Sequence, residues 1–99
     1  MSETYTSGIW TVKPGHEDEF VSVWTDFVTW AKQQPGSGAF RLVRDVDNPN
    51  RYFSFAPWET FEAQRLWKET EEFAARMKRV REHVDGFEPS TYELVTTVE

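Results

Sequence analysis

The segment Arg51-Tyr52-Phe53-Ser54-Phe55-Ala56-Pro57-Trp58 carries the strongest structural signal in the chain. Its side chains alternate between two faces with a period of two residues, as in a β-strand. One face carries Tyr52, Ser54 and Trp58, and the other carries Phe53 and Phe55. Because both faces are aromatic, we expect each of them to pack against another layer of protein.

The segments on either side predict a hairpin and a helical region in two pieces. Upstream, the turn sequence Asp47-Asn48-Pro49-Asn50 separates this strand from a second alternating segment over residues 39–46. Downstream, Thr60 is a typical N-cap for a helix over residues 61–69, and Thr70 is a typical N-cap for a second helical piece.

The outer segments complete the order of elements. Residues 5–13 alternate as a strand, and residues 17–34 place apolar side chains at the i, i+3, i+4 and i+7 spacing of a helix. The second helical piece is expected to end before Gly86, which resembles the glycine that follows many helices. Residues 90–98 alternate again and predict the last strand. The sequence therefore predicts one α+β domain over residues 1–99, with the ferredoxin-like order β-α-β-β-α-β.

Two helical regions can cover only one face of such a sheet. The opposite face would carry a group of large apolar side chains, and soluble monomers rarely expose such a patch. The candidates are Ile9, Val43, Phe53, Phe55 and Val95. A second copy of the sheet is the simplest cover, so we expect a face-to-face homodimer.

Composition and charge exclude several classes of function. The 99 residues include no cysteine, which excludes a disulfide framework, a zinc ribbon and a cysteine nucleophile. A formal net charge of −6 argues against nucleic-acid binding. No apolar run approaches the roughly 20 residues of a membrane span, and residues 1–4 lack the features of a signal peptide. We expect a cytoplasmic protein with no nucleic-acid or membrane partner.

Motifs for metal or cofactor binding are also missing from the sequence. His16 and His83 are the two histidines, and neither has a second His at metal-ligand spacing or belongs to a His-x-x-x-His or Glu-x-x-His pattern. Gly36-Ser37-Gly38 follows a predicted helix, whereas a phosphate-binding glycine loop precedes one. We therefore predict no metal and no cofactor.

The five tryptophans leave two interpretations open. Large aromatic side chains fill the space between a sheet and its helices efficiently, so they can simply form the core. Alternatively, several of them line an apolar pocket that accepts a flat aromatic ligand. The candidates for such a lining are Trp10, Trp24, Trp58 and Trp67.

A pocket of this kind also needs polar groups that orient the ligand. Ser54 and Tyr52 point to the same side of their strand and are suited to that role. Arg76 or Lys78, on the last helix, could reach the rim and stabilise a developing oxyanion. The alternative is that both cations are ordinary surface charges near a helix C-terminus. Met77 belongs to the apolar stripe of the same helix.

Several local features occur together in this chain. They are the Lys13-Pro14-Gly15 break before an acidic helix start, the strand over residues 51–59, the Phe61-Glu62-Ala63 helix opening and the later Glu72-Phe73. Together they resemble the antibiotic biosynthesis monooxygenase family over nearly the whole chain. The resemblance implies a dimeric α+β barrel of ferredoxin-like protomers with a pocket between sheet and helices in each. It also implies oxidation of polyphenolic, anthrone-type substrates by molecular oxygen without metal or flavin.

Another branch of this family binds and degrades heme, using an Asn on the first strand, a Trp, and a His on the second helical region. Trp58 matches the Trp. However, Ser7 or Gly8 stands where the Asn is expected, and no His occurs between Glu59 and Glu82. Heme degradation by that mechanism is therefore disfavoured.

From the resemblance we predict a cofactor-independent monooxygenase that acts on an aromatic or polyphenolic small molecule with molecular oxygen. The catalytic residues would be Trp58, Ser54 and Lys78, where the anthrone-oxidising pattern has a Trp, an Asn and an Arg. The residues in contact with the substrate would be Trp10, Trp24, Tyr52, Trp67, Arg76 and Met77. The alternatives are a non-catalytic small-molecule-binding protein, an accessory dimer with a filled core, and cyclisation or isomerisation of a polyketide.

Overall fold

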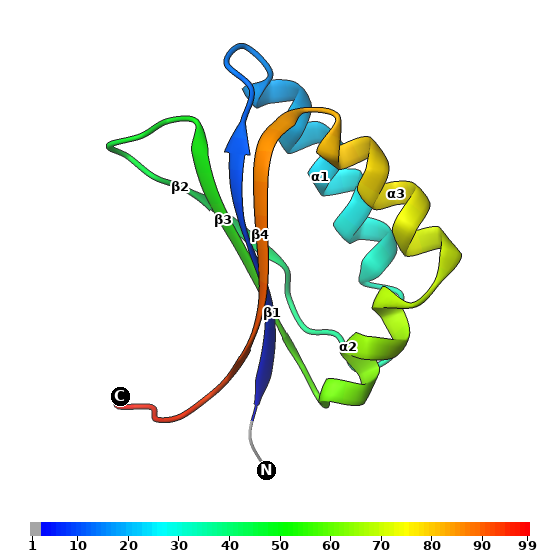
Figure 1. Cartoon of the computed structure of the whole chain (residues 1–99). Coiled ribbons are helices and arrows are strands. Elements are labelled where there is room, and N and C mark those ends of the chain that lie inside the picture. The colour runs from blue at the N-terminus through cyan, green and yellow to red at the C-terminus, as the bar shows by residue number, and fades with distance from the viewer. Residues whose placement is uncertain (1–2) are drawn as a thin grey trace.

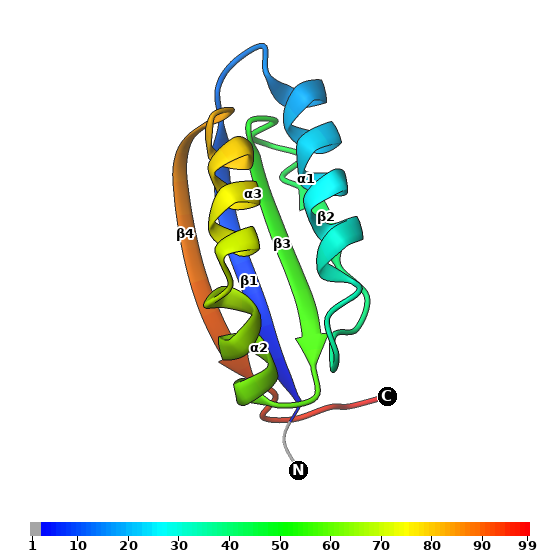
Figure 2. The same cartoon turned by 90° about the vertical axis from the view of Figure 1, so that its right-hand side faces the viewer.

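A four-stranded antiparallel sheet carries three helices on one of its faces (Figures 1 and 2). The structure, a computed structural model, describes residues 3–99, so two of the residues considered for a signal peptide, Met1 and Ser2, lie outside it. The elements are β1 (Thr4–Val12), α1 (Glu17–Ala31), β2 (Arg41–Arg44), β3 (Arg51–Trp58), α2 (Phe61–Lys68), α3 (Glu71–Arg81) and β4 (Val84–Glu93). This order confirms the predicted ferredoxin-like α+β class.

The strand order β2-β3-β1-β4 places β1 and β3 at the centre of the sheet. On both central strands the even-numbered residues are buried beneath the helices. The register aligns Gly8 with Ser54 on one side and Pro89 on the other, and it aligns Trp10 with Tyr52 and Phe87. The aromatic strand that opened the sequence analysis therefore presents its serine to the helix layer, as predicted.

The core lies between the sheet and the helices. From α1, the buried side chains are Phe20, Trp24, Phe27 and Ala31, which recur at helical spacing along one face. They meet Trp10 and Tyr52 from the sheet: the Phe20 ring lies 5.4 Å from that of Trp10 and 5.2 Å from that of Tyr52. The apolar periodicity of the first helix is confirmed, although the helix ends at Ala31, before the predicted residue 34.

The second helical region consists of two capped helices, as predicted. The Thr60 hydroxyl accepts a hydrogen bond from the backbone N–H of Ala63 at 3.0 Å, and α2 begins there. The Thr70 hydroxyl accepts one from the backbone N–H of Phe73 at 3.1 Å, and α3 begins there. Each threonine satisfies a backbone donor that the first turn of a helix leaves unpaired.

The prediction for the last strand was wrong in its position. The strand spans Val84–Glu93 instead of residues 90–98, and Gly86 lies inside it rather than after a helix. Val95 is outside the sheet and 89% exposed, so it does not belong to the open sheet face. Because β4 is an edge strand, it tolerates Pro89 and a glycine, which weaken the strand signal in the sequence.

The face of the sheet opposite the helices is uncovered in a single chain (Figure 1). Ile9, Phe53 and Phe55 are only partly buried there, and Val43 is 48% exposed. Four of the five residues predicted for this face are therefore on it, and only Val95 is not. Among residues 3–99, no helix is both long enough and apolar enough to cross a membrane.

Candidate functional site

A cavity of about 260 Å³ lies between the sheet and the helix layer. Side chains from β1, α1, β3, α2, α3 and β4 line it, together with Phe40 from the segment before β2. Most of the lining is aromatic or aliphatic, and the aromatic side chains on the helix side of the sheet are Trp10, Trp24, Phe27, Phe40, Trp67, Phe73 and Phe87. Such a lining favours a flat, apolar ligand.

The structure brings some of the predicted site residues together and leaves others apart. Those that line the cavity are Trp10, Trp24, Ser54, Trp67 and Met77. Those that do not line it are Trp58, Tyr52, Arg76 and Lys78. Most of the predicted residues that do not line the cavity are polar. The cations at the cavity are not the two that the sequence analysis expected.

Ser54 is one of the polar groups that line the cavity. The indole Nε1–H of Trp10 donates a hydrogen bond to the Ser54 hydroxyl oxygen at 2.9 Å. This bond uses an acceptor position of the hydroxyl and leaves its own proton free to donate. Ser54 can therefore donate a hydrogen bond to an oxygen atom of a ligand, while Trp10 holds the serine in place.

Trp67 lines the same cavity and carries an unused hydrogen-bond donor. It is 4% exposed, and its indole Nε1–H has no hydrogen-bond partner among the described residues. Its ring stacks on Trp58 with centroids 4.9 Å apart. Trp58 is held in turn by a 3.1 Å hydrogen bond from its Nε1–H to the Thr6 hydroxyl. Trp58 therefore supports the cavity wall from behind.

Lys68 and Arg81 are the cations at the cavity. Burial lowers the pKa of the Lys68 ammonium below its usual value, because the charged form loses hydration. The guanidinium of Arg81 lies over the Phe87 ring, 5.9 Å from its centroid. A lysine beside an apolar cavity attracts an anionic ligand, since an anion replaces the solvation that the ammonium has lost.

The two cations predicted from the sequence lie elsewhere. Arg76 packs over the Trp30 ring at 5.1 Å and approaches the Glu72 carboxylate at 3.5 Å, and Lys78 is exposed. Tyr52 is buried against Phe20, and its hydroxyl has no partner among the described residues. The sequence analysis missed Lys68, because the periodicity of the eight-residue helix α2 does not fix which polar side chain reaches the cavity.

Phe87 was missed because the last strand was predicted too late in the chain. It stacks on Trp10 at a centroid distance of 4.0 Å and an interplanar angle of 19°. Gly8 makes room for it, since a Cβ at that position would lie 2.6 Å from Phe87 Cε1. Trp10 and Phe87 therefore line the cavity as a stacked pair, for which the glycine leaves room.

Comparisons with known proteins place this chain in a wider group. A family model described as antibiotic biosynthesis monooxygenase matches residues 8–79, which is more than half of the chain. No curated protein matches the chain. SnoaB, a cofactor-independent oxygenase from Streptomyces nogalater, has a solved structure with a TM-score of 0.90 and 24% identity, covering 99% of this chain and 98% of that chain.

Two further solved structures show the same fold. A putative antibiotic biosynthesis monooxygenase from Bordetella bronchiseptica has a TM-score of 0.84 and 19% identity, covering 99% of this chain and 100% of that chain. A conserved protein from Methanosarcina mazei Go1 has a TM-score of 0.83 and 16% identity, covering 93% and 92% of the two chains. At these identities, the likeness establishes the shared fold.

Proposed function

The chain belongs to the antibiotic biosynthesis monooxygenase family, and we propose that it is a cofactor-independent monooxygenase of an aromatic, polyphenol-like small molecule. The observation that carries this proposal is the aromatic cavity with hydrogen-bond donors and a desolvated lysine on its walls. Its volume of about 260 Å³ is near the lower end of the range of ligand pockets, roughly 300–1,000 Å³. We therefore expect a compact substrate.

The proposed reaction needs no external reductant. Loss of a proton from an activated CH₂ group gives an electron-rich carbanion, which transfers one electron to dioxygen. The resulting radical and superoxide combine to form a carbon–oxygen bond, and a peroxide results after protonation. Cleavage of the O–O bond and loss of water then leave a ketone. One oxygen atom ends in the product and the other in water, so atoms and electrons balance.

The protein contributes donors to the oxygen on which negative charge develops. Ser54, Trp67 and Lys68 each present a hydrogen-bond donor at the cavity, and the aromatic walls exclude water. Donors that are already in place stabilise an oxyanion strongly in such an environment. A buried donor without a partner costs about 1–3 kcal/mol, so an acceptor oxygen at Trp67 would remove that cost on binding.

Oxygen consumption with dithranol, a simple tricyclic anthrone, tests the proposal. We expect one dioxygen consumed per dithranol and formation of the corresponding anthraquinone, at a rate well above that of autoxidation without protein. Quenching of tryptophan fluorescence by dithranol without oxygen consumption would contradict the proposal and favour a non-catalytic binding protein.

Lys68→Met provides the first variant to test. Removing one donor to a developing oxyanion typically lowers kcat by about 10²–10³-fold, and we expect a loss of this order. Lys78→Met is the matched control, because it removes the same charge from an exposed position on α3 outside the cavity. Equal rates for the two variants would show that Lys68 has no part in the reaction.

A further inference from the structure

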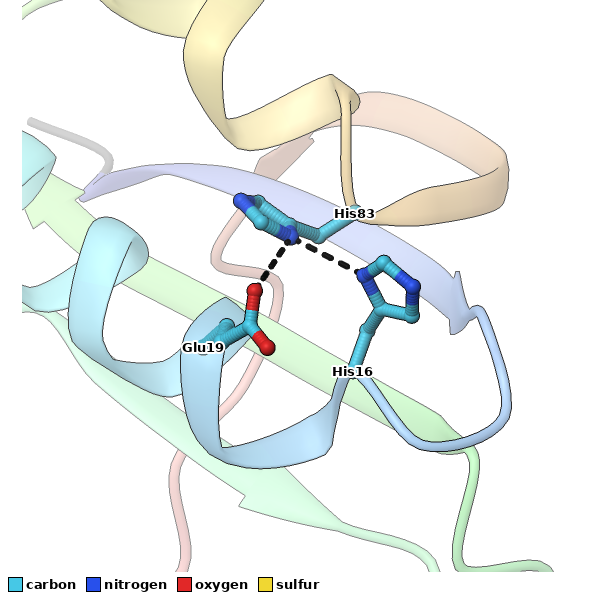
Figure 3. Close-up of side chains that lie close together, drawn as sticks. All are labelled: His16, Glu19 and His83. Carbon is cyan, nitrogen blue, oxygen red and sulfur yellow. Dashed lines mark hydrogen bonds and ion pairs between the residues drawn. The ribbon is translucent and has the colours of Figure 1, made fainter.

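The two histidines of the chain lie side by side at one end of the helix layer, away from the cavity (Figure 3). His16 immediately precedes α1, and His83 lies in the connection between α3 and β4. Glu19, in the first turn of α1, points toward the same place. The three side chains therefore come together from segments that are 67 residues apart.

The distances between the ligand atoms fit a single metal ion. The Nδ1 atoms of His16 and His83 are 3.2 Å apart, and Nδ1 of His83 is 3.7 Å from a carboxylate oxygen of Glu19. One ligand atom from each residue lies within 4.8 Å of the other two. Zinc binds nitrogen at about 2.0–2.1 Å in tetrahedral geometry, so neighbouring ligand atoms are about 3.3 Å apart.

The Nδ1 atoms of the two histidines can also offer lone pairs to a metal ion. Two facing Nδ1 atoms at 3.2 Å can share only one proton, so at least one of them presents a lone pair to the other. A metal ion would take the place of that shared proton and accept both lone pairs. The Glu19 side chain is 65% exposed, so it has room to rotate toward the two imidazoles.

Backbone hydrogen bonds fix the positions of the two histidines relative to each other. The Lys13 N–H donates to the His83 carbonyl at 3.0 Å, and the Lys13 carbonyl accepts from the His16 N–H at 2.9 Å. One residue therefore ties together both backbones that carry the imidazoles. Glu17 is engaged elsewhere, since its carboxylate accepts from the Gly15 N–H at 3.1 Å and from the Asn50 amide at 2.7 Å. Glu19 is thus the carboxylate left for the cluster.

We propose that His16, Glu19 and His83 bind one zinc-like divalent ion, with water as the fourth ligand. Two imidazole nitrogens and one carboxylate suit zinc and its neighbours in the first transition series better than magnesium or calcium, which prefer oxygen ligands. The bound ion links the start of α1 to the end of α3 and stabilises the folded chain, because an unfolded chain offers no such site. The site is independent of the proposed oxygenation.

Zinc titration followed by long-range ¹H–¹⁵N NMR of the imidazoles tests the proposal directly. The chain has only two histidines, so two sets of signals report on the whole site. We expect both Nδ1 resonances to shift together, with saturation at one zinc per chain and with Nε2 protonated in both rings. A response from one ring only, coordination through Nε2, or no response would overturn the proposal.

Two variants with the same loss of charge test the carboxylate. Glu19→Gln removes the proposed ligand, and Asp18→Asn removes a neighbouring exposed carboxylate that is outside the cluster. We expect Glu19→Gln to weaken zinc binding about tenfold or more, since loss of an outer-shell partner alone costs about 10–100-fold. Asp18→Asn should bind zinc as the wild type does. If both variants weakened zinc binding equally, the effect would come from the loss of a nearby negative charge, and this would contradict the role of Glu19 as a ligand.

His83→Asn tests whether the ion acts on the fold. Zinc should raise the Tm of the wild type and leave the Tm of His83→Asn unchanged, and magnesium should affect neither. Circular dichroism of the zinc-free variant shows whether it is folded, and the NMR test on the wild type does not depend on that result. A zinc-induced rise in Tm that persists in His83→Asn would place the ion elsewhere.

Discussion

Gly8 is buried on the helix side of β1, between Ser54 on β3 and Pro89 on β4. A Cβ at this position would lie 2.6 Å from Phe87 Cε1 and 3.2 Å from Trp10 Nε1. Real Cβ atoms are not found so close to carbon, so any side chain here must move the Phe87 ring. The hydrogen bond from Trp10 to Ser54 lies beside the same contact.

Gly8→Ala is therefore expected to destabilise the protein by about 1–3 kcal/mol, the usual cost of overpacking. It should also reduce ligand binding, because the displaced ring can move only into the cavity or away from Trp10. Urea unfolding measures the first effect, and fluorescence titration with dithranol measures the second.

Gly86→Ala is the matched control for this prediction. A Cβ at Gly86 meets Thr11 at 3.6 Å, an ordinary contact distance, so the change should be neutral or stabilise by up to about 1 kcal/mol. If both variants lose the same stability, the effect comes from strand glycines in general and not from crowding at Phe87.

Some site residues could be predicted from the sequence because a short-range rule fixes them. Two-residue alternation places Ser54 on the helix side of β3, and the same rule places Trp10 on the helix side of β1. The sequence contains no comparable rule for Lys68. The eight-residue helix α2 can be rotated about its axis by its tertiary contacts, so its periodicity alone does not fix which polar side chain reaches the cavity.

Thr70 joins two helices through its side chain, at the scale of secondary-structure elements. Its hydroxyl accepts from the Phe73 N–H at 3.1 Å and donates to the Trp67 carbonyl at 2.9 Å. One side chain therefore caps the start of α3 and satisfies a carbonyl at the end of α2. Trp67 and Phe73 both line the cavity, so this junction also sets the shape of the cavity wall.

Thr70→Val should lower the free energy of unfolding by about 1–2 kcal/mol, because it keeps the shape of the side chain but removes the cap. Thr70→Ser should recover most of the loss. Thr29→Val is the control, since the exposed Thr29 hydroxyl only bonds the carbonyl of Thr25 within α1, where such a bond adds little stability. A Thr70→Val effect no larger than that of Thr29→Val in urea unfolding would contradict the capping role.

The elements themselves were predictable where local signals agreed. Residues 51–58 combine alternation with a strong turn before them and a cap after them, and β3 has those bounds. For β4, the local sequence pattern predicts the wrong residues. Leu94 and Val98 continue the alternation but lie beyond the end of β4, whereas Gly86 and Pro89 are inside the strand. Pairing with β1 outweighs intrinsic strand preference, and that pairing is a tertiary property.

Long-range proximity explains why the histidine cluster escaped the sequence analysis. His16 and His83 are separated by most of the chain, and no spacing motif relates them. They meet because the loop before α1 and the connection after α3 are joined at Lys13. Ligand sets of this kind become visible only once the topology is known.

The open sheet face determines the expected assembly of the whole molecule. Phe53 and Phe55 stack there with centroids 5.6 Å apart, and the half-exposed Val43 pairs with Phe53 on the neighbouring strand. An apolar face of this kind is costly in water. We therefore expect the mass of two chains by native mass spectrometry or by light scattering.

Phe53→Lys should convert that dimer to a monomer, because it places a charge at the centre of the face. Val46→Lys is the control, since Val46 is 91% exposed and lies outside the four strands. Near-ultraviolet circular dichroism checks that both variants keep their tertiary packing. A monomeric wild type, or a Phe53→Lys variant that stays dimeric, would contradict the face-to-face assembly.

The junction at Thr70 between α2 and α3 affects how quickly a ligand can enter and leave the cavity. Trp67 and Lys68 come from α2, and Phe73 comes from α3. This wall of the cavity is therefore made of two helices, each with its own N-cap. At the far end of α3, the connection to β4 is tied to the start of α1 through Lys13. We therefore expect a rigid-body rotation of α2 about Thr70 to open the cavity while the sheet stays intact. We expect the frequency of that rotation to set an upper limit on substrate entry and product release.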